Sequence, residues 1–158
     1  MDFGKNSHVK DQFVKRAMVW YAGTDAIAEG TALCYNVLLG TATTEDGTRS
    51  SYVIRPTAAT ALFFAGVVAR DYTAKAGGQF IEINLPGSKN VRVLLTTGNT
   101  VVGVTNLAFV YGTGTGGFVA NAAVGSGTAK AVQTTTGADY VNVFLDEGVQ
   151  CGGVDADA

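Results

Sequence analysis

The chain has 158 residues, of which 47% are hydrophobic and 15% are charged, and its formal net charge is −2. This length fits a single domain, and the charged fraction lies well below the roughly 25% of an average soluble domain. The 11 basic residues are spread among 13 acidic ones, which argues against nucleic acid as a partner because that affinity comes mostly from clustered Lys and Arg.

Membrane association is not expected either. No apolar run approaches the roughly 20 residues that span a bilayer. The residues after Met1 lack the apolar segment of a signal peptide. We therefore expect a protein made in the cytoplasm with no membrane partner. Its charge-poor surface either lies against other proteins or exposes many Thr, Ser, Asn and Gly side chains.

The composition favours an all-β fold. The chain contains 21 glycines and 2 prolines, which favours many tight turns over stiff linkers. Long helical patterns are absent, and β-branched residues are plentiful in short apolar runs. These features are typical of an all-β domain.

Residues 1–16 are polar and locally basic, and they precede the first apolar run. They contain three separated apolar residues, Phe3, Val9 and Phe13, without the spacing of a helical stripe. One interpretation is a frayed terminus. The other is an extended arm that lies over a neighbouring subunit, and this interpretation makes Phe3, Val9 and Phe13 candidate partner-binding residues, because a merely solvated tail would not need apolar anchors.

Strands are predicted at residues 17–22, 31–39 and 62–69. Trp20 and Tyr21 are adjacent, so in a strand one faces the core and the other faces the surface or an interface. Residues 62–69 are apolar on both faces, which predicts a central strand with both sides covered.

Residues 80–85 and 91–95 alternate between apolar and polar side chains with a period of two, the pattern of half-buried strands. Between them lies a polar break that begins with Pro86 and Gly87. A Pro-Gly break between two such runs predicts a hairpin or a pair of strands joined by a short loop.

Residues 112–117 are rich in glycine and resemble a phosphate-binding loop superficially. Such loops need a following helix N-terminus and set glycine spacing, and neither is present here. We therefore expect a flexible surface loop and no nucleotide.

The final predicted strand covers residues 140–145. Its apolar and aromatic residues lie on both faces, which predicts a strand buried on one side and in contact with a partner on the other. Residues 149–158 are glycine-rich and acidic, and we expect a mobile tail.

No residue pattern indicates catalysis. His8 is the single histidine, and Cys34 and Cys151 lie far apart in the sequence with no neighbouring histidine. Two thiols are favoured over a disulfide in a reducing compartment. Asp146 and Glu147 are sequence neighbours and would point apart in a strand. We therefore predict no catalytic residue, no metal, no cofactor and no enzyme activity.

Three segments resemble the small capsid decoration (cement) proteins of tailed bacteriophages. They are AGTDAIAEGTALCYN at residues 22–36, AGVVARDYTAKAGGQFIEINLPG at residues 65–87, and VNVFLDEG at residues 141–148. Together they place the resemblance over residues 17–148. It implies a compact antiparallel β-barrel or β-tulip domain at 17–148, between an arm at 1–16 and a flexible tail at 149–158.

The resemblance also implies a function. The expected protein is a homotrimer on the capsid surface of a virion, bound to the major capsid protein and stabilising the shell against internal DNA pressure. The alternative is a receptor- or glycan-binding module of a phage head or tail fibre, because β-barrels with Thr- and Gly-rich loops also present adhesive surfaces.

Overall fold

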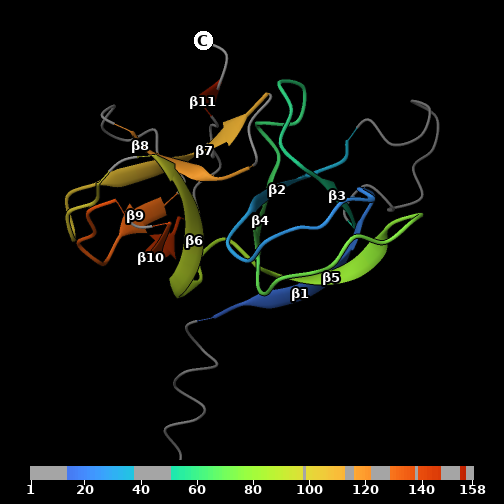
Figure 1. Ribbon diagram of the computed structural model, residues 1–158, viewed down its shortest axis with the longest axis horizontal. Coiled ribbons are helices and arrows are strands. Elements are labelled where there is room, and N and C mark those ends of the chain that lie inside the picture. Colours follow the sequence, from blue (N-terminus) through green and yellow to red (C-terminus); the bar gives the residue numbers. More distant parts are fainter. Residues whose placement is uncertain are drawn as a thin grey trace, which may run out of the picture.

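A computed structural model describes residues 14–37, 51–97, 99–112, 116–121, 129–137, 139–146 and 154–155 of the chain. These residues form strands, turns and bends but no helix (Figure 1), which confirms the all-β prediction. No described segment is a helix of the length and apolar character that crossing a membrane requires.

The first half of the chain forms a closed barrel, at the right of Figure 1. Closure pairs each strand on both sides, which limits the exposed strand edge that promotes aggregation. In the order in which they pair, its strands are β1 (Arg16–Tyr21), β3 (Tyr52–Ile54), β2 (Ala32–Tyr35), β4 (Phe64–Val68) and β5 (Gln79–Asn84).

The second half forms a six-stranded sheet beside the barrel, at the left of Figure 1. Strand β9 pairs with both β10 and β7, so this sheet also curls back on itself. In sheet order the strands are β11 (Val154–Asp155), β7 (Asn106–Tyr111), β8 (Phe118–Asn121), β6 (Lys89–Thr97), β10 (Tyr140–Leu145) and β9 (Ala129–Ala131).

The strand pairing departs from a purely antiparallel arrangement. The pairs β1–β3, β6–β8 and β7–β11 are parallel. Parallel neighbours need a crossover connection, and an intervening strand supplies it in two of these pairs: β2 lies between β1 and β3 in the chain, and β7 lies between β6 and β8.

The predicted hairpin between residues 80–85 and 91–95 is wrong. Both segments are strands, β5 and β6, but β5 belongs to the barrel and β6 to the second sheet. Strand β5 already has β1 on one side and β4 on the other, so no edge remains for β6. The Pro86-Gly87 break therefore carries the chain from one body to the other.

The buried apolar side chains of the described residues form two hydrophobic cores. One fills the barrel, and the other lies between the barrel and the second sheet. Strands β2 and β4 contribute to both: Leu33 and Val68 belong to the barrel core, whereas Cys34 and Val67 belong to the second core. All of β4 is buried, which confirms a central strand covered on both sides. The predicted range of 62–69 was too long, because Leu62 and Phe63 precede the strand and are exposed.

A bulge in β4 sets this division of side chains. Leu33 pairs with Gly66 and Cys34 with Phe64, so Ala65 is an extra residue in β4. Gly66 has φ = 150°, and a Cβ atom there would collide with the carbonyl oxygen of Asn84 in β5. Only glycine therefore fits where β4 and β5 approach each other.

The glycine-rich stretch at 112–117 differs from the expected surface loop at its C-terminal end. Gly116 and Gly117 are buried, and the amide of Ala32 in β2 donates a hydrogen bond of 2.7 Å to the Gly116 carbonyl oxygen. These glycines therefore link the second sheet to the barrel. Residues 113–115 lie outside the described part of the chain.

The bulge yields a stability prediction. Gly66→Ala should lower the free energy of unfolding by more than about 2 kcal/mol, because it adds a steric collision to a strained φ. Gly103→Ala is the matched control: Gly103 also has a positive φ, 70°, but its added Cβ would meet no atom within 4 Å, so we expect a loss of about 1 kcal/mol. Urea unfolding of the two variants measures both, and equal losses would contradict the assignment.

Candidate interaction surface

The described residues offer little reactive chemistry. None of their His, Cys, Asp and Glu side chains form a group of three that could hold a metal ion. Cys34 carries a thiol and is completely buried in β2, so solvent does not reach it. The exposed surfaces of the described residues are therefore the candidates for a functional site.

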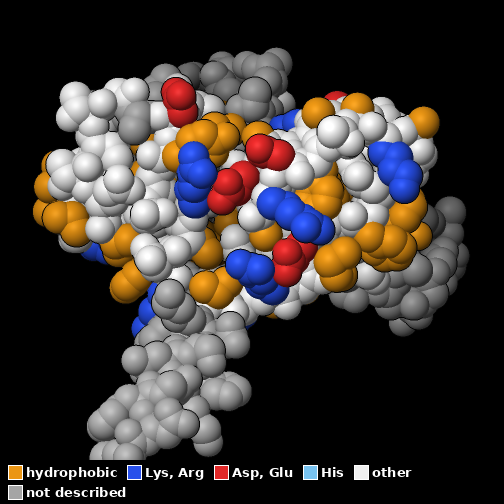
Figure 2. Space-filling model, turned by 60° about the horizontal axis from the view of Figure 1, so that its bottom comes forward, with side chains coloured by type: hydrophobic (Ala, Val, Ile, Leu, Met, Phe, Trp, Pro, Cys, Tyr) orange, Lys and Arg blue, Asp and Glu red, His pale blue; other side chains and the backbone are white. Residues whose placement is uncertain are grey.

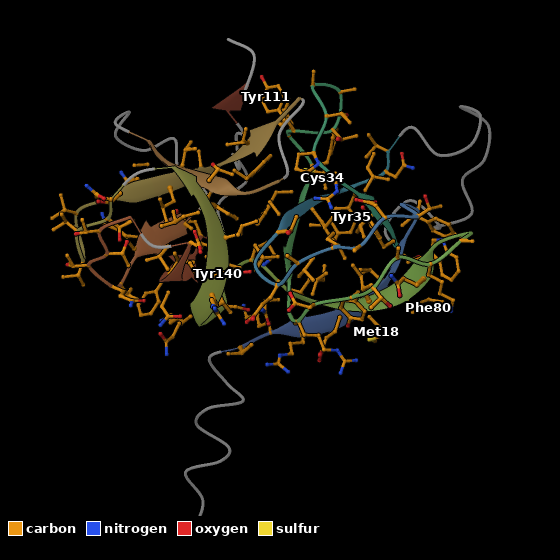
Figure 3. The ribbon with its side chains drawn as sticks, in the orientation of Figure 1. Met18, Cys34, Tyr35, Phe80, Tyr111 and Tyr140 are labelled. Atoms are coloured by element: carbon orange, nitrogen blue, oxygen red, sulfur yellow. The ribbon has the colours of Figure 1, made fainter. Side chains whose placement is uncertain are left out.

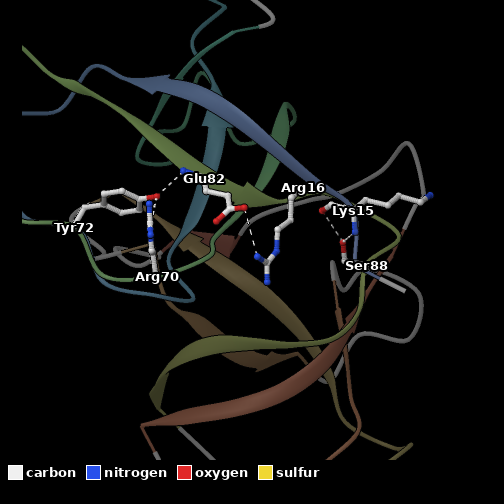
Figure 4. A network of polar contacts seen from close by, with 6 residues as sticks. All are labelled: Lys15, Arg16, Arg70, Tyr72, Glu82 and Ser88. Carbon is white, nitrogen blue, oxygen red and sulfur yellow. Dashed lines mark hydrogen bonds and ion pairs between the residues drawn. The ribbon is translucent and has the colours of Figure 1, made fainter. Parts of the chain in front are cut away.

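A line of polar contacts crosses the outer surface of the barrel (Figure 4). The Nη1 atom of Arg16 lies 3.4 Å from Oε1 of Glu82. The backbone amide of Glu82 donates to the Tyr72 hydroxyl at 2.7 Å, and Nε of Arg70 donates to the same hydroxyl at 3.1 Å. Strands β1 and β5 are thereby joined to the segment that follows β4.

A second line of contacts joins the barrel to the second sheet. Nη1 of Arg92 in β6 lies 3.3 Å from Oε2 of Glu29, and its guanidinium stacks 4.0 Å from the ring centre of Tyr140 in β10. The amide of Glu29 donates to Asp71 at 2.8 Å. Exposed ion pairs of this kind contribute at most about 1 kcal/mol each.

The two lines of polar contacts contain six charged residues, which together form what we call the charged belt. Their charges sum to zero, three positive and three negative, so the belt gives no net attraction to a polyanion. Figure 2 shows basic and acidic side chains in a row across the middle of this face. The members are Arg16, Glu29, Arg70, Asp71, Glu82 and Arg92.

The chain enters the fold at the junction between the two bodies. The buried hydroxyl of Ser88 accepts a hydrogen bond from the Lys15 amide at 2.9 Å and donates to the Lys15 carbonyl oxygen at 3.1 Å (Figure 4). The side chain of Val14 packs against the second core. These contacts hold the end of the N-terminal segment beside the start of β1.

An exposed apolar surface lies on the outside of β1, β3 and β5, and we call it the aromatic face. It consists of Met18, Trp20, Tyr52 and Phe80. Trp20 pairs with Phe80 across the strands, with ring centres 4.9 Å apart and nearly perpendicular planes, and its ring lies 6.3 Å from that of Tyr52. Met18 and Phe80 are 59% and 62% exposed, and Figure 3 shows both at the lower edge of the barrel.

Strand alternation places these side chains outside. Val19 and Tyr21 of β1 and Ile81 of β5 fill the barrel core, so their neighbours in the sequence point outward. Tyr21 is buried and Trp20 is not, which confirms that the two adjacent aromatics face opposite sides.

Gly78 lies directly against the indole ring of Trp20 in the aromatic face. Its φ is +86°, and a Cβ atom there would lie 2.6 Å from the carbonyl oxygen of Tyr21 and 3.1 Å from Nε1 of Trp20. The indole ring of Trp20 thus packs closely over this glycine turn.

A second feature is a cavity of about 400 Å³ beside the barrel, lined by Arg55, Asp71, Tyr72 and Leu94 together with residues of the 26–31 segment. Arg55 forms an ion pair with Asp25, and its Nε and Nη2 atoms donate hydrogen bonds of 3.0 and 2.7 Å to Oδ2. The cavity wall is mainly apolar. The positive charge of Arg55 is balanced by the carboxylate of Asp25.

The pKa values of the groups around Asp25 reflect this network. Burial disfavours the Asp25 carboxylate, but hydrogen bonds from Arg55 and Tyr21 outweigh that effect and hold its pKa below the usual value. The Tyr21 hydroxyl donates to Asp25 at 2.9 Å. Burial, and then this hydrogen bond, raise the pKa of Tyr21 to about 12.

Strand β10 was predicted to be buried on one side and to contact a partner on the other, and the structure shows the buried side. Val141, Val143 and Leu145 are buried, and Phe144 is 41% exposed, which confirms a strand buried on one side. The ammonium group of Lys89 lies 5.8 Å from the ring centre of Phe144. Contact of this outer face with a partner stays a prediction.

The residues predicted to bind a partner, Phe3, Val9 and Phe13, lie outside the described residues, as do His8 and Cys151. Their roles, and the division of the chain at residues 16 and 148, stay predictions. Sequence reasoning missed the exposure of Phe80. The available signal was its position, since Phe80 shares the strand face of Glu82 rather than that of Ile81.

Comparisons with known proteins point to a fold rather than a family. The sequence matches no protein-family model, and no curated protein is similar to it. The two-part all-β fold resembles a solved structure, the N base of the head fiber gp8.5 in bacteriophage phi29. The TM-score is 0.54 at 15% sequence identity, and the match covers 84% of this chain and 95% of that chain.

The raised pKa of Tyr21 gives a pH prediction. An unfolded tyrosine ionises near pH 10, whereas folded Tyr21 stays protonated up to about pH 12. The folded state therefore binds more protons in this window, and stability that is complete below pH 10 is lost as the pH rises through it. The expected loss is about 2 to 3 kcal/mol.

Tyr21→Phe removes this titration while keeping the ring. Chemical unfolding between pH 9 and pH 12 should show the free energy of the natural protein falling towards that of the variant. A difference between the two proteins that does not change with pH would refute the prediction.

Proposed function

We propose that this protein is a structural component of a tailed-bacteriophage virion that binds the outside of the major capsid shell as a homotrimer and stabilises it. The observation that carries the proposal is the likeness of the fold to a phage head fiber base, over 84% of this chain and 95% of that one. A head fiber base and a cement protein are both structural parts of a phage head, so the likeness supports a structural role there.

The surfaces of the described residues support this role. The aromatic face presents apolar side chains of three adjacent strands. Charge-poor, aromatic surfaces are typical of protein interfaces. In a closed trimer, one such surface serves three times.

Stabilisation follows from linkage. A protein that binds the assembled, expanded shell and not its separated subunits favours the assembled state. At a free concentration one hundred times the dissociation constant, each occupied site contributes about 2.7 kcal/mol. No chemical step is needed, in keeping with the prediction that the chain is not an enzyme.

The cavity beside Arg55 favours a second candidate, a receptor- or glycan-binding module of a head or tail fibre. Its volume of about 400 Å³ falls within the range of small-molecule sites, roughly 300–1,000 Å³. An apolar wall with a few polar groups also suits a sugar ring.

Shell binding separates the two candidates. We expect the purified protein to sediment as a trimer and to bind expanded empty shells of its own virus at a fixed, saturable ratio, raising the temperature at which the shells break. Titration with Arg55→Ala should leave shell binding unchanged, because this side chain lines the cavity. Binding to host cells or glycans without binding to shells would replace the first function by the second.

A further inference from the structure

We infer that the aromatic face receives the N-terminal segment, residues 1–13, of a neighbouring copy of the chain. The inference rests on the proposed homotrimer and names the contact that holds it together. It assigns a receiving surface to the predicted anchors Phe3, Val9 and Phe13.

The aromatic face is exposed to solvent in a single copy of the chain. The barrel is already filled by Val19, Tyr21, Ile81 and other apolar side chains, so the outward residues have no place inside it. Met18 and Phe80 are more than half exposed. The ring of Trp20 contacts the rings of Tyr52 and Phe80. Contiguous exposed apolar surface of this kind marks an interaction site.

The N-terminal segment has the composition and length to provide this cover. Its apolar residues are separated by polar and basic ones, so an extended segment offers anchors without being apolar throughout. Thirteen extended residues reach about 43 to 47 Å. Strand β1 has six residues, or about 20 Å, so the segment can cross to a neighbour and still span the aromatic face.

The entry point of the chain favours a neighbouring copy over the segment's own barrel. Val14 packs against the second core, and Lys15 is held by Ser88. To lie on its own aromatic face, the chain would have to reverse immediately before β1. Residues 12–15, directly before β1, contain no Gly, Pro, Asn, Asp or Ser, the residues that dominate tight turns.

Exchange of segments also fits a closed assembly. Each copy would give one segment and receive one, which is a head-to-tail contact. Such contacts form a ring when the rotation between copies closes, and three copies make the proposed trimer.

Disulfide trapping tests the inference. Two differently tagged full-length chains are mixed and reassembled, one carrying Val9→Cys and the other Phe80→Cys, both with Cys151→Ser so that the buried Cys34 is the only other thiol. We expect a disulfide between the differently tagged chains. The matched control replaces Phe80→Cys by Val102→Cys, which alters a residue 53% exposed on the second body and should give no such product.

Two trapping results would overturn the inference. One is a yield no higher than that of the Val102 control. The other is a chain carrying both Val9→Cys and Phe80→Cys that forms its disulfide only within itself, because the segment then covers its own barrel.

A charge placed in the aromatic face gives an independent readout. Phe80→Glu, and separately deletion of residues 2–13, should each weaken trimer association about tenfold or more, as loss of a buried aromatic anchor does. Val102→Glu should not change it, and circular dichroism checks that each variant is folded. A folded Phe80→Glu variant that is as trimeric as the natural protein overturns the inference.

Shell binding, measured separately on the natural protein, distinguishes this failure from failure of the proposed function. If the natural protein binds shells but neither perturbation weakens its trimer, the proposed function stands and the segment contact is wrong. If the natural protein is monomeric and does not bind shells, both are wrong.

Discussion

The fold depends on two strands, β2 and β4, that are buried on both faces. Their side chains alternate between the barrel core and the core shared with the second sheet. Because each strand serves two cores, the barrel and the sheet cannot separate without exposing apolar surface of both. The bulge beside Gly66 shifts the register of β4 against β2 by one residue, at the point where β5 also approaches. This shift sets which β4 side chains enter each core.

This arrangement determines which surfaces remain for partners. The barrel pairs its strands in a closed ring, so side-chain faces rather than strand edges are the natural sites of contact. On β1 and β5 the inward residues fill the barrel, and the outward residues form the aromatic face and part of the charged belt. The described part of the surface also carries exposed apolar side chains outside the aromatic face, among them Leu62, Val101 and Val104.

The likeness to a phage head fiber base is a likeness of fold. At 15% identity the two sequences share few side chains, so the likeness lies in the backbone and in the pairing of its strands. The proposed seat on a capsid therefore rests on a likeness of fold, whereas the proposed exchange of N-terminal segments rests on the residues of this chain.

The sequence by itself determined the local features: the all-β class, a doubly covered strand within residues 62–69, and the opposite orientations of Trp20 and Tyr21. Each follows from alternation along one strand. The tertiary structure alone decided that β5 and β6 lie in different bodies, that Gly116 is buried against β2, and that outward residues of β1, β3 and β5 gather into the aromatic face. The physical reason is that alternation shows which side chains share a face, whereas strand partners and covering layers depend on residues far away in the chain.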